Sequence, residues 1–340
     1  MEGKGVPTPG ASSSNSIGKN QHQKGRARLD IFALVPYILL IILIIAVVSL
    51  NPRLLSLQVL ETKLNNGLPL MFMTTAQALV ILTGGIDLSI GGVLSLGTAI
   101  AATQMGEGLA SIVLWSLIIL LVGLSAGSIN GLIVTYMRVT PFIATLATWS
   151  IWSGIALFVL PKEGGSIPRS LKDIVQKGAL LGLPKSFCLL VLLIVFWLLI
   201  KRTRFGTMIY AVGSSRSSAY LSGAPVKRTL IMTYALSGLL AATGGLYRTI
   251  QYSAGSPTAG DPFILTSAAA VIMGGMSLAG GRGGVVPSIV GALILLLIND
   301  LNYFMGVSTF YTPMVQGVLL IIAVAIQSLG NYLRARRVTL

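Results

Sequence analysis

The stretch ALVILTGGIDLSIGG, residues 78–92, places a single carboxylate between two apolar segments. Gly84 and Gly85 allow the backbone to turn, and Asp87 can accept N–H bonds at the start of the next helix, where the helix dipole favours negative charge. The stretch therefore predicts two helices joined by a short break. A second interpretation stays open, in which Asp87 carries protons or touches a transported solute.

Charged residues are rare on both sides of this stretch. The 340 residues include 24 Lys and Arg and nine Asp and Glu, and 54% of the chain is hydrophobic. A water-soluble globule of this size needs more charged residues on its surface. Backbone polar groups in lipid must be satisfied internally, and the sequence lacks the alternating ten-residue pattern of a membrane β-barrel. The sequence predicts an all-α, polytopic membrane helix bundle.

About ten transmembrane helices are expected, because each needs roughly 20 apolar residues to cross a hydrocarbon core of about 30 Å. They are predicted near residues 31–50, 66–84, 88–105, 109–136, 140–160, 183–200, 229–248, 262–280, 285–305 and 313–330. With both termini in the cytoplasm, sixteen of the 24 Lys and Arg face inward, as the positive-inside rule requires. The chain then divides into a disordered cytoplasmic tail (1–30), a transmembrane domain (31–330) and a basic cytoplasmic tail (331–340).

The segment AAVIMGGMSLAGG, residues 269–281, echoes residues 78–92. Further pairs follow in the same order in each half: Ile129-Asn130 and Thr140-Pro141, then Ile298-Asn299 and Thr312-Pro313. Duplicated halves are frequent in transporters, whose pathway often lies beside Gly-interrupted helices. The candidate pathway residues at the two breaks are Gly84, Gly85, Asp87, Ser89, Gly274 and Gly275. The alternative is that apolar Gly-rich segments resemble one another by composition.

Glycine also recurs at intervals of four in Gly123, Gly127 and Gly131. Small residues at this spacing allow membrane helices to approach closely, although chance in a Gly-rich chain is an equally good explanation. The loop 161–185 is expected to be external and irregular, with a short helix over 170–176. Asp300, near the outer end of its span, is either a transport residue or an interfacial side chain.

The loop 201–228 contains six basic residues and no acidic one, which predicts a cytoplasmic position. Within it, Ser217 to Leu221 can form a helix of one or two turns, capped by Ser214 or Ser215 and ending at Gly223. A short helix on the membrane face is a natural docking surface for a cytoplasmic partner. The alternative is a solvated basic linker.

The sequence lacks the residues that several kinds of chemistry need. One cysteine, Cys188, excludes an intrachain disulfide, and one histidine, His22, excludes a His-based metal cluster or catalytic triad. No phosphate-binding loop matches the required spacing. The basic residues lie at membrane edges and not on one contiguous face, which argues against nucleic-acid binding. We therefore expect no catalytic residue, metal or cofactor in this chain, and energy must come from elsewhere.

Taken together, these motifs resemble the ribose-type permeases of bacterial ABC sugar importers, within the branched-chain amino acid and ribose permease family. The resemblance covers about residues 31–330. It rests on VILTGGIDLSIG (80–91), PFIATL (141–146), the stretch 204–245, PTAG (257–260), and GGMSLAGGRG (274–283) leading into GALI (291–294).

This resemblance implies a type II-like permease of the bacterial inner membrane. Its implied partners are a second permease subunit, a cytoplasmic ATPase that binds ATP and Mg, and a periplasmic solute-binding protein. Family members carry their ATPase-docking coupling helix at a position that corresponds here to Ser217, Ser218, Ala219, Tyr220, Leu221, Ser222 and Gly223.

Two departures from the family pattern concern the partner and the substrate. Arg216, Ser217 and Ser218 stand where the family commonly has an acidic residue and two alanines. Ile264-Leu265-Thr266 replaces Glu-Leu-Asp. These departures fit a divergent subunit that works beside a different permease as a heterodimer, although a homodimer stays open.

The function expected from the sequence is import of a sugar or sugar-like polar solute. The alternative is a secondary transporter that uses Asp87 and Asp300 for proton coupling.

Overall fold

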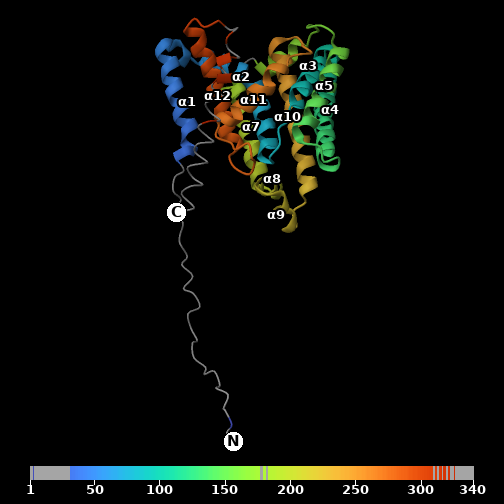
Figure 1. The fold of residues 1–340 in the computed structure, drawn as a ribbon. Coiled ribbons are helices and arrows are strands. Elements are labelled where there is room, and N and C mark those ends of the chain that lie inside the picture. The colour runs from blue at the N-terminus through green and yellow to red at the C-terminus, as the bar shows by residue number, and fades with distance from the viewer. Residues whose placement is uncertain are drawn as a thin grey trace.

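The computed structural model describes Gly3, residues 31–176, 179–180 and 183–308, and the single residues 311, 314, 315, 317, 318, 321 and 325. Both predicted tails, apart from Gly3, and most of the predicted span 313–330 lie outside the described residues. The described part is almost entirely helical (Figure 1). The prediction of an all-α fold is confirmed.

The helices are α1 (Ile31–Leu50), α2 (Leu57–Leu82), α3 (Ser89–Gln104), α4 (Leu109–Tyr136), α5 (Pro141–Val159), α6 (Arg169–Gln176), α7 (Lys185–Arg202), α8 (Arg204–Ser214), α9 (Arg216–Leu221), α10 (Val226–Tyr252), α11 (Asp261–Met273) and α12 (Val285–Phe304). A 3₁₀ turn, η1 (Pro52–Leu55), precedes α2. The strands β1 (Ala179–Leu180) and β2 (Leu183–Pro184) form a small antiparallel hairpin that the sequence analysis missed.

Nine of the ten predicted spans fall on α1 to α5, α7 and α10 to α12. Four described helices, α4, α5, α10 and α12, are long and apolar enough to cross a membrane. The pair α7 and α8 together forms a fifth candidate, bent by 77°. The two largest boundary differences are at α2, which begins at Leu57 and not near residue 66, and at α11, which ends at Met273 and not near residue 280. The residues after Met273 form turns with glycines at positive φ.

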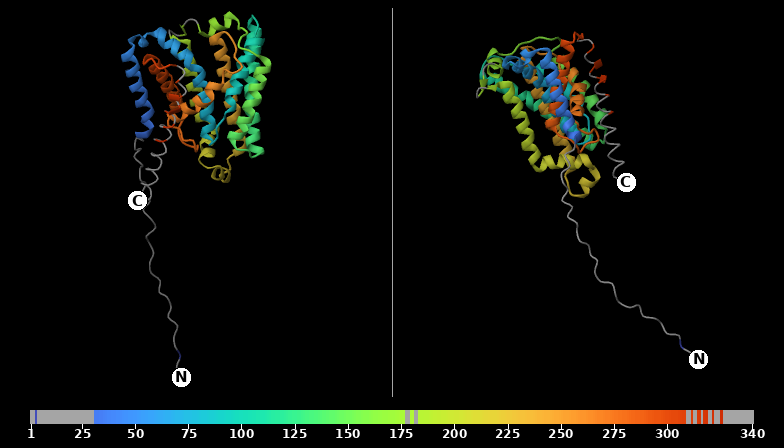
Figure 2. Two further views of the ribbon diagram at one scale, coloured as in Figure 1. Left: turned by 45° about the horizontal axis from the view of Figure 1, so that its top comes forward. Right: turned by 90° about the vertical axis from the view of Figure 1, so that its left-hand side faces the viewer.

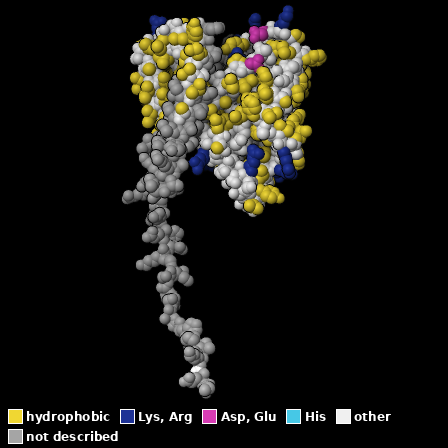
Figure 3. All heavy atoms as spheres, viewed as in Figure 1, with side chains coloured by type: hydrophobic (Ala, Val, Ile, Leu, Met, Phe, Trp, Pro, Cys, Tyr) yellow, Lys and Arg dark blue, Asp and Glu magenta, His cyan; other side chains and the backbone are white. Residues whose placement is uncertain are grey.

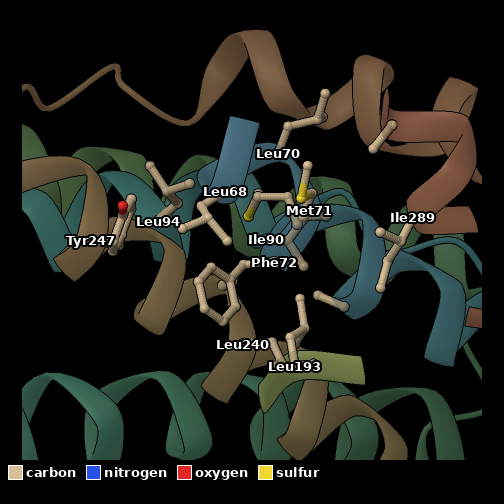
Figure 4. Packing of buried hydrophobic residues seen from close by; sticks show 14 of the residues in the cluster. Leu68, Leu70, Met71, Phe72, Ile90, Leu94, Leu193, Leu240, Tyr247 and Ile289 are labelled. Atoms are coloured by element: carbon tan, nitrogen blue, oxygen red, sulfur yellow. The ribbon is translucent and has the colours of Figure 1, made fainter. Parts of the chain in front are cut away.

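The centre of the bundle is α2, whose residues from Gly67 to Leu82 are all buried. It packs against α10, α11 and α12, and Figures 1 and 2 show α1 beside α12 at one side and α4 and α5 at the other. In Figure 4, Leu68 and Phe72 of α2 lie among Leu94 of α3 and Leu240 of α10. In this region α2 is enclosed on all sides, and its residues there are apolar apart from Thr74, Thr75 and Gln77.

The outer helices show the opposite pattern, with large apolar side chains facing outward. Exposed Leu, Ile, Val and Phe residues cover α1, α4, α5 and α7. Figure 3 shows this apolar surface as a broad band with Lys and Arg at its two edges. Lipid as the surrounding solvent accounts for both features.

The glycines at intervals of four are used in packing. Gly123, Gly127 and Gly131 of α4 lie against the backbone of α10, so that a Cβ at Gly127 would overlap the carbonyl oxygen of Tyr234. On the α10 side, Gly238 approaches the backbone of Gly123 equally closely. The structure therefore decides between chance and packing in favour of packing.

We expect Gly127→Val to destabilise the bundle, because the added side chain must push α4 away from α10 and overpacking typically costs about 1–3 kcal/mol. Thermal unfolding of the purified protein in detergent measures the effect. Gly154→Val on α5 is the matched control, because a Cβ there meets no atom within 4 Å. Equal unfolding temperatures for the two variants would contradict a tight α4–α10 seam.

Candidate functional site

The first helix break lies between α2 and α3 at residues 83–88. Gly84 has φ +78°, a left-handed conformation that glycine adopts without a steric penalty. The N–H of Gly84 donates to Ile81 O (2.9 Å), and the N–H of Gly85 donates to Val80 O (3.1 Å). These bonds satisfy carbonyls that the end of α2 leaves free. The predicted break is confirmed.

The second break follows α11, and the C-terminal end of α11 is capped in the same way as that of α2. Gly275 has φ +81°, its N–H donates to Ile272 O (2.8 Å), and the N–H of Met276 donates to Val271 O (3.3 Å). Val271, Ile272 and Gly275 correspond to Val80, Ile81 and Gly84 in the echo between the two segments. A shared backbone geometry thus accompanies the sequence similarity, and the duplication itself stays a prediction.

The two breaks meet each other and the α8–α9 segment. The N–H of Gly281 donates to Leu82 O (2.9 Å), which joins the second break to the end of α2. Gly213 of α8 packs so closely on Leu82 that a Cβ there would overlap its carbonyl oxygen. Arg216 of α9 donates from Nη2 to Thr83 O (3.4 Å). The end of α2 is therefore in direct contact with α8, α9 and the second break.

Asp87 is fully buried and joins three helices. Its Oδ1 accepts from the backbone N–H (3.0 Å) and the hydroxyl (2.6 Å) of Ser89, and its Oδ2 accepts from the hydroxyl of Ser237 on α10 (2.9 Å). Asn130 of α4 donates in turn to the Ser89 hydroxyl (2.6 Å). The capping interpretation of Asp87 matches these bonds, whereas a role in transport stays untested.

Thr145 of α5 holds the other side of the first break. Its hydroxyl oxygen accepts from the Leu88 N–H (3.1 Å) and lies 3.2 Å from Ile86 O. Thr145 belongs to the segment PFIATL, which supported the family resemblance. One role of that motif is therefore to provide a hydrogen-bond partner for the backbone of the break.

Asp300 occupies a different environment. It forms an ion pair with Lys63 of α2, 2.5 Å between Nζ and Oδ1, and both side chains are partly exposed. Among the described residues, Asp300 and Asp87 have different partners: Lys63 for Asp300, and Ser89 and Ser237 for Asp87. The structure therefore does not bring these two carboxylates together.

The predicted short helix over residues 217–221 is confirmed as α9. Ser215 caps it, accepting from the Ser218 N–H (3.2 Å), and Gly223 follows its end with φ +78°. Ala219 is buried, whereas Tyr220 and Leu221 are 73% and 85% exposed. A short helix that buries its small residue and presents its two large ones is suited to contact another molecule.

The sequence analysis missed α8. Two features of the sequence could have predicted this helix: Thr203 as its cap, and apolar residues at helical spacing in Phe205, Ile209 and Val212. In the structure, the Thr203 hydroxyl accepts from the Gly206 N–H (3.2 Å). Ile209 and Val212 are buried. The helix therefore lies across the end of the bundle, bent by 77° from α7, with its apolar face inward, and connects α7 to α9.

The sequence analysis also missed the contact between Asp261 and Trp149. The N–H of the Trp149 indole donates to Asp261 Oδ1 (3.3 Å), and Asp261 is exposed. Asp261 begins α11 about halfway along the bundle, because the N–H of the preceding Gly260 donates to Ser95, near the middle of α3 (2.9 Å). The sequence signal was an acidic residue followed by Pro262 at the start of an apolar segment.

We expect Asp87→Ala to destabilise the protein strongly, because it leaves the buried hydroxyls of Ser89 and Ser237 without their acceptor. Each buried polar group without a partner costs about 1–3 kcal/mol. Asp87→Asn keeps an acceptor oxygen and should unfold at nearly the native temperature. Thermal unfolding of both variants in detergent tests this, and equal losses from Ala and Asn would show that the charge matters more than the capping bonds.

Comparisons with known proteins agree with the resemblance. Residues 59–324 match the family described as "Branched-chain amino acid transport system / permease component". The chain is 38% identical over 297 residues to the ribose import permease of Bacillus subtilis, covering 85% of this chain and 90% of that protein. No solved structure matches it.

Two further relatives come from Escherichia coli. The ribose import permease is 33% identical over 298 residues, covering 86% of this chain and 92% of the relative. The galactose/methyl galactoside import permease is 31% identical over 312 residues, covering 86% and 93%. The chain therefore belongs to the branched-chain amino acid and ribose permease family, the non-catalytic membrane subunits of ABC transporters.

Proposed function

We propose that this chain is the permease subunit of an ABC importer for a sugar or a sugar-like polar solute, delivered by a periplasmic binding protein. The observation that carries the proposal is similarity along about 85% of the chain to permeases named for ribose and galactose import. A second permease subunit, identical or different, and a cytoplasmic ATPase complete the transporter. ATP and Mg belong to that ATPase, and this chain binds no cofactor.

The proposed topology has ten transmembrane helices in the bacterial inner membrane with both termini in the cytoplasm. The distribution of charge supports it. Eight described basic residues lie at the end of the bundle that carries α9: Arg138, Lys201, Arg202, Arg204, Arg216, Lys227, Arg228 and Arg282. The connections at that end contain no Asp or Glu that reaches solvent among the described residues, because Asp87 is buried. We call this the α9 end.

The opposite end carries seven described Lys and Arg, so the bias depends on the eight basic residues of the two terminal tails, which the proposed topology adds to the α9 end. Sixteen of the 24 Lys and Arg then lie there, and the positive-inside rule makes it the cytoplasmic side.

The coupling helix in this proposal consists of Ser217 to Gly223, and Leu221 and Tyr220 supply its contact surface. Its position supports a mechanical role, because Arg216 bonds to the Thr83 carbonyl and α8 packs on Leu82. A movement of α9 driven by the ATPase is thereby applied to the end of α2 and to both breaks. The bundle then alternates between outward and inward access.

The breaks position the pathway, and a different pair of side chains touches the solute. Asp87, Ser89, Gly85 and Gly274 are buried, so they hold backbone geometry. Asp261 with Trp149 instead presents a carboxylate and an aromatic face at the exposed surface halfway along the bundle. An ionisable residue at membrane depth is a functional candidate, because exposure to lipid is costly for it. Carboxylate oxygens accept hydrogen bonds from sugar hydroxyls, and an aromatic ring covers the sugar's apolar face.

Uptake in proteoliposomes tests the proposed function. The chain is reconstituted with its ATPase and binding protein, and labelled ribose and galactose are supplied with ATP inside or with a proton gradient alone. We expect uptake only with ATP and the ATPase. Uptake that survives loss of the ATPase and collapses with the proton gradient would favour the proton-coupled alternative.

We expect Leu221→Glu to abolish co-purification of the ATPase, because it places a charge at the centre of the exposed apolar tip of α9. The protein should still insert and fold, since the side chain is 85% exposed. Leu109→Glu, at an exposed leucine at the opposite end of the bundle, is the control. Unchanged ATPase binding by Leu221→Glu would remove the docking role.

We expect Asp261→Ala to reduce solute uptake at least about tenfold while ATPase binding is unchanged, because hydrogen bonds to a charged group contribute about 1.5–3 kcal/mol. Glu107→Ala, in the exposed connection between α3 and α4, is the control for removal of one acidic residue. If both variants transport equally well, Asp261 does not line the pathway.

A further inference from the structure

A cavity of about 340 Å³ opens at the α9 end, between the turn joining α4 to α5, the start of α9 and the start of α10. Three of the residues that line it are basic: Arg138, Arg216 and Lys227. None of its lining residues is acidic. Its volume lies in the range of ligand pockets, and its charge favours an anion.

Two of the three cations, Arg216 and Lys227, contact groups that leave their charge unneutralised. Arg216 donates one bond to the Thr83 carbonyl, and its guanidinium has five N–H donors in all. Lys227 Nζ lies 4.9 Å from the centre of the Tyr136 ring. Arg138 has φ +56°, which is uncommon for a residue with a side chain. None of the three forms a salt bridge within the described part of the chain.

The surface beside this cavity is apolar. Tyr136 and Met137 at the end of α4, and Phe142 and Ile143 at the start of α5, are all exposed. Figure 3 shows Lys and Arg side chains along the lower edge, where Figure 1 places α8 and α9, with apolar surface directly above them. A cationic pocket next to an apolar flank at the membrane boundary is complementary to a molecule with an anionic head and hydrocarbon chains.

We propose that the pocket formed by Arg138, Arg216 and Lys227 binds the phosphate-bearing headgroup of an anionic phospholipid from the cytoplasmic leaflet. The acyl chains lie along the exposed apolar residues of α4 and α5. Basic pockets on the cytoplasmic side of membrane helices suit such headgroups, and the nearby apolar flank favours a lipid over a soluble anion. The site is separate from the proposed solute pathway and from the tip of α9.

Arg216 gives the bound lipid a connection to the transport machinery. The same guanidinium lines the pocket and bonds to Thr83, the residue that ends α2. A headgroup in the pocket therefore lies one side chain away from the first helix break.

Lipid binding to the purified full-length protein tests the proposal. Delipidated protein in detergent is titrated with phosphatidylglycerol or with zwitterionic phosphatidylcholine, and bound lipid is counted by native mass spectrometry. We expect phosphatidylglycerol to bind about tenfold more tightly, and Arg216→Gln or Lys227→Gln to remove most of that preference. Arg228→Gln is the matched control, because Arg228 is an exposed neighbour on α10 that does not line the pocket, and it should keep the preference.

Four results would overturn the proposal. Equal binding of the two lipids would show that no headgroup site exists. An equal loss from Arg228→Gln would show diffuse attraction to a basic surface. Displacement of the lipid by millimolar inorganic phosphate, with phosphate bound in its absence, would assign the pocket to a soluble anion. Lost ATPase binding by Lys227→Gln in lipid-free detergent, with lipid selectivity intact, would assign the three cations to the ATPase. Unfolding temperatures confirm that the variants are folded.

Discussion

Every polar group at a helix break inside a membrane must find its partner within the protein, because lipid offers none. The first break meets this requirement with few residues. Asp87 accepts three hydrogen bonds, from Ser89 and Ser237, and Thr145 serves the backbone on the other side. The second break satisfies the end of α11 with the same left-handed glycine. The irregular backbone of the first break is therefore stable because α4, α5 and α10 enclose it.

This enclosure also makes the breaks sensitive to their surroundings. The end of α2 contacts α8 and the second break through backbone groups, which do not adapt as flexible side chains do, and it contacts α9 through the side chain of Arg216. The α4–α10 seam, in contrast, is closed by glycines on both helices and is suited to move as one unit. The bundle therefore has one tightly packed helix pair, α4 and α10, and two helix breaks at its centre. This arrangement supports the rocking motion that we propose for transport.

The distribution of charged side chains fits the role of a membrane subunit within an ABC transporter. The chain is the non-catalytic membrane subunit, and the energy of ATP hydrolysis has to reach it through contact. The α9 end presents basic side chains, two large exposed side chains on α9 and a basic pocket beside an apolar flank. That end therefore offers two separate surfaces, one that we propose for the ATPase and one that we propose for anionic lipid. The two carboxylates of the alternative proton path lie in different local structures, because Asp300 pairs with Lys63 and Asp87 accepts from Ser237.

The sequence by itself predicted that lipid is the solvent and where nine of the membrane helices lie, because apolar runs are local signals. It also predicted a short helix that begins after Ser214 or Ser215 and ends at Gly223, because caps are local signals too. Gly84 and Gly275 were also readable, since a left-handed turn at a helix end favours glycine. Only the tertiary structure decided that Ser237 completes the shell of Asp87, that Lys63 pairs with Asp300, and that Trp149 meets Asp261. These contacts join segments far apart in the chain, and helix packing, which local patterns do not encode, brings them together.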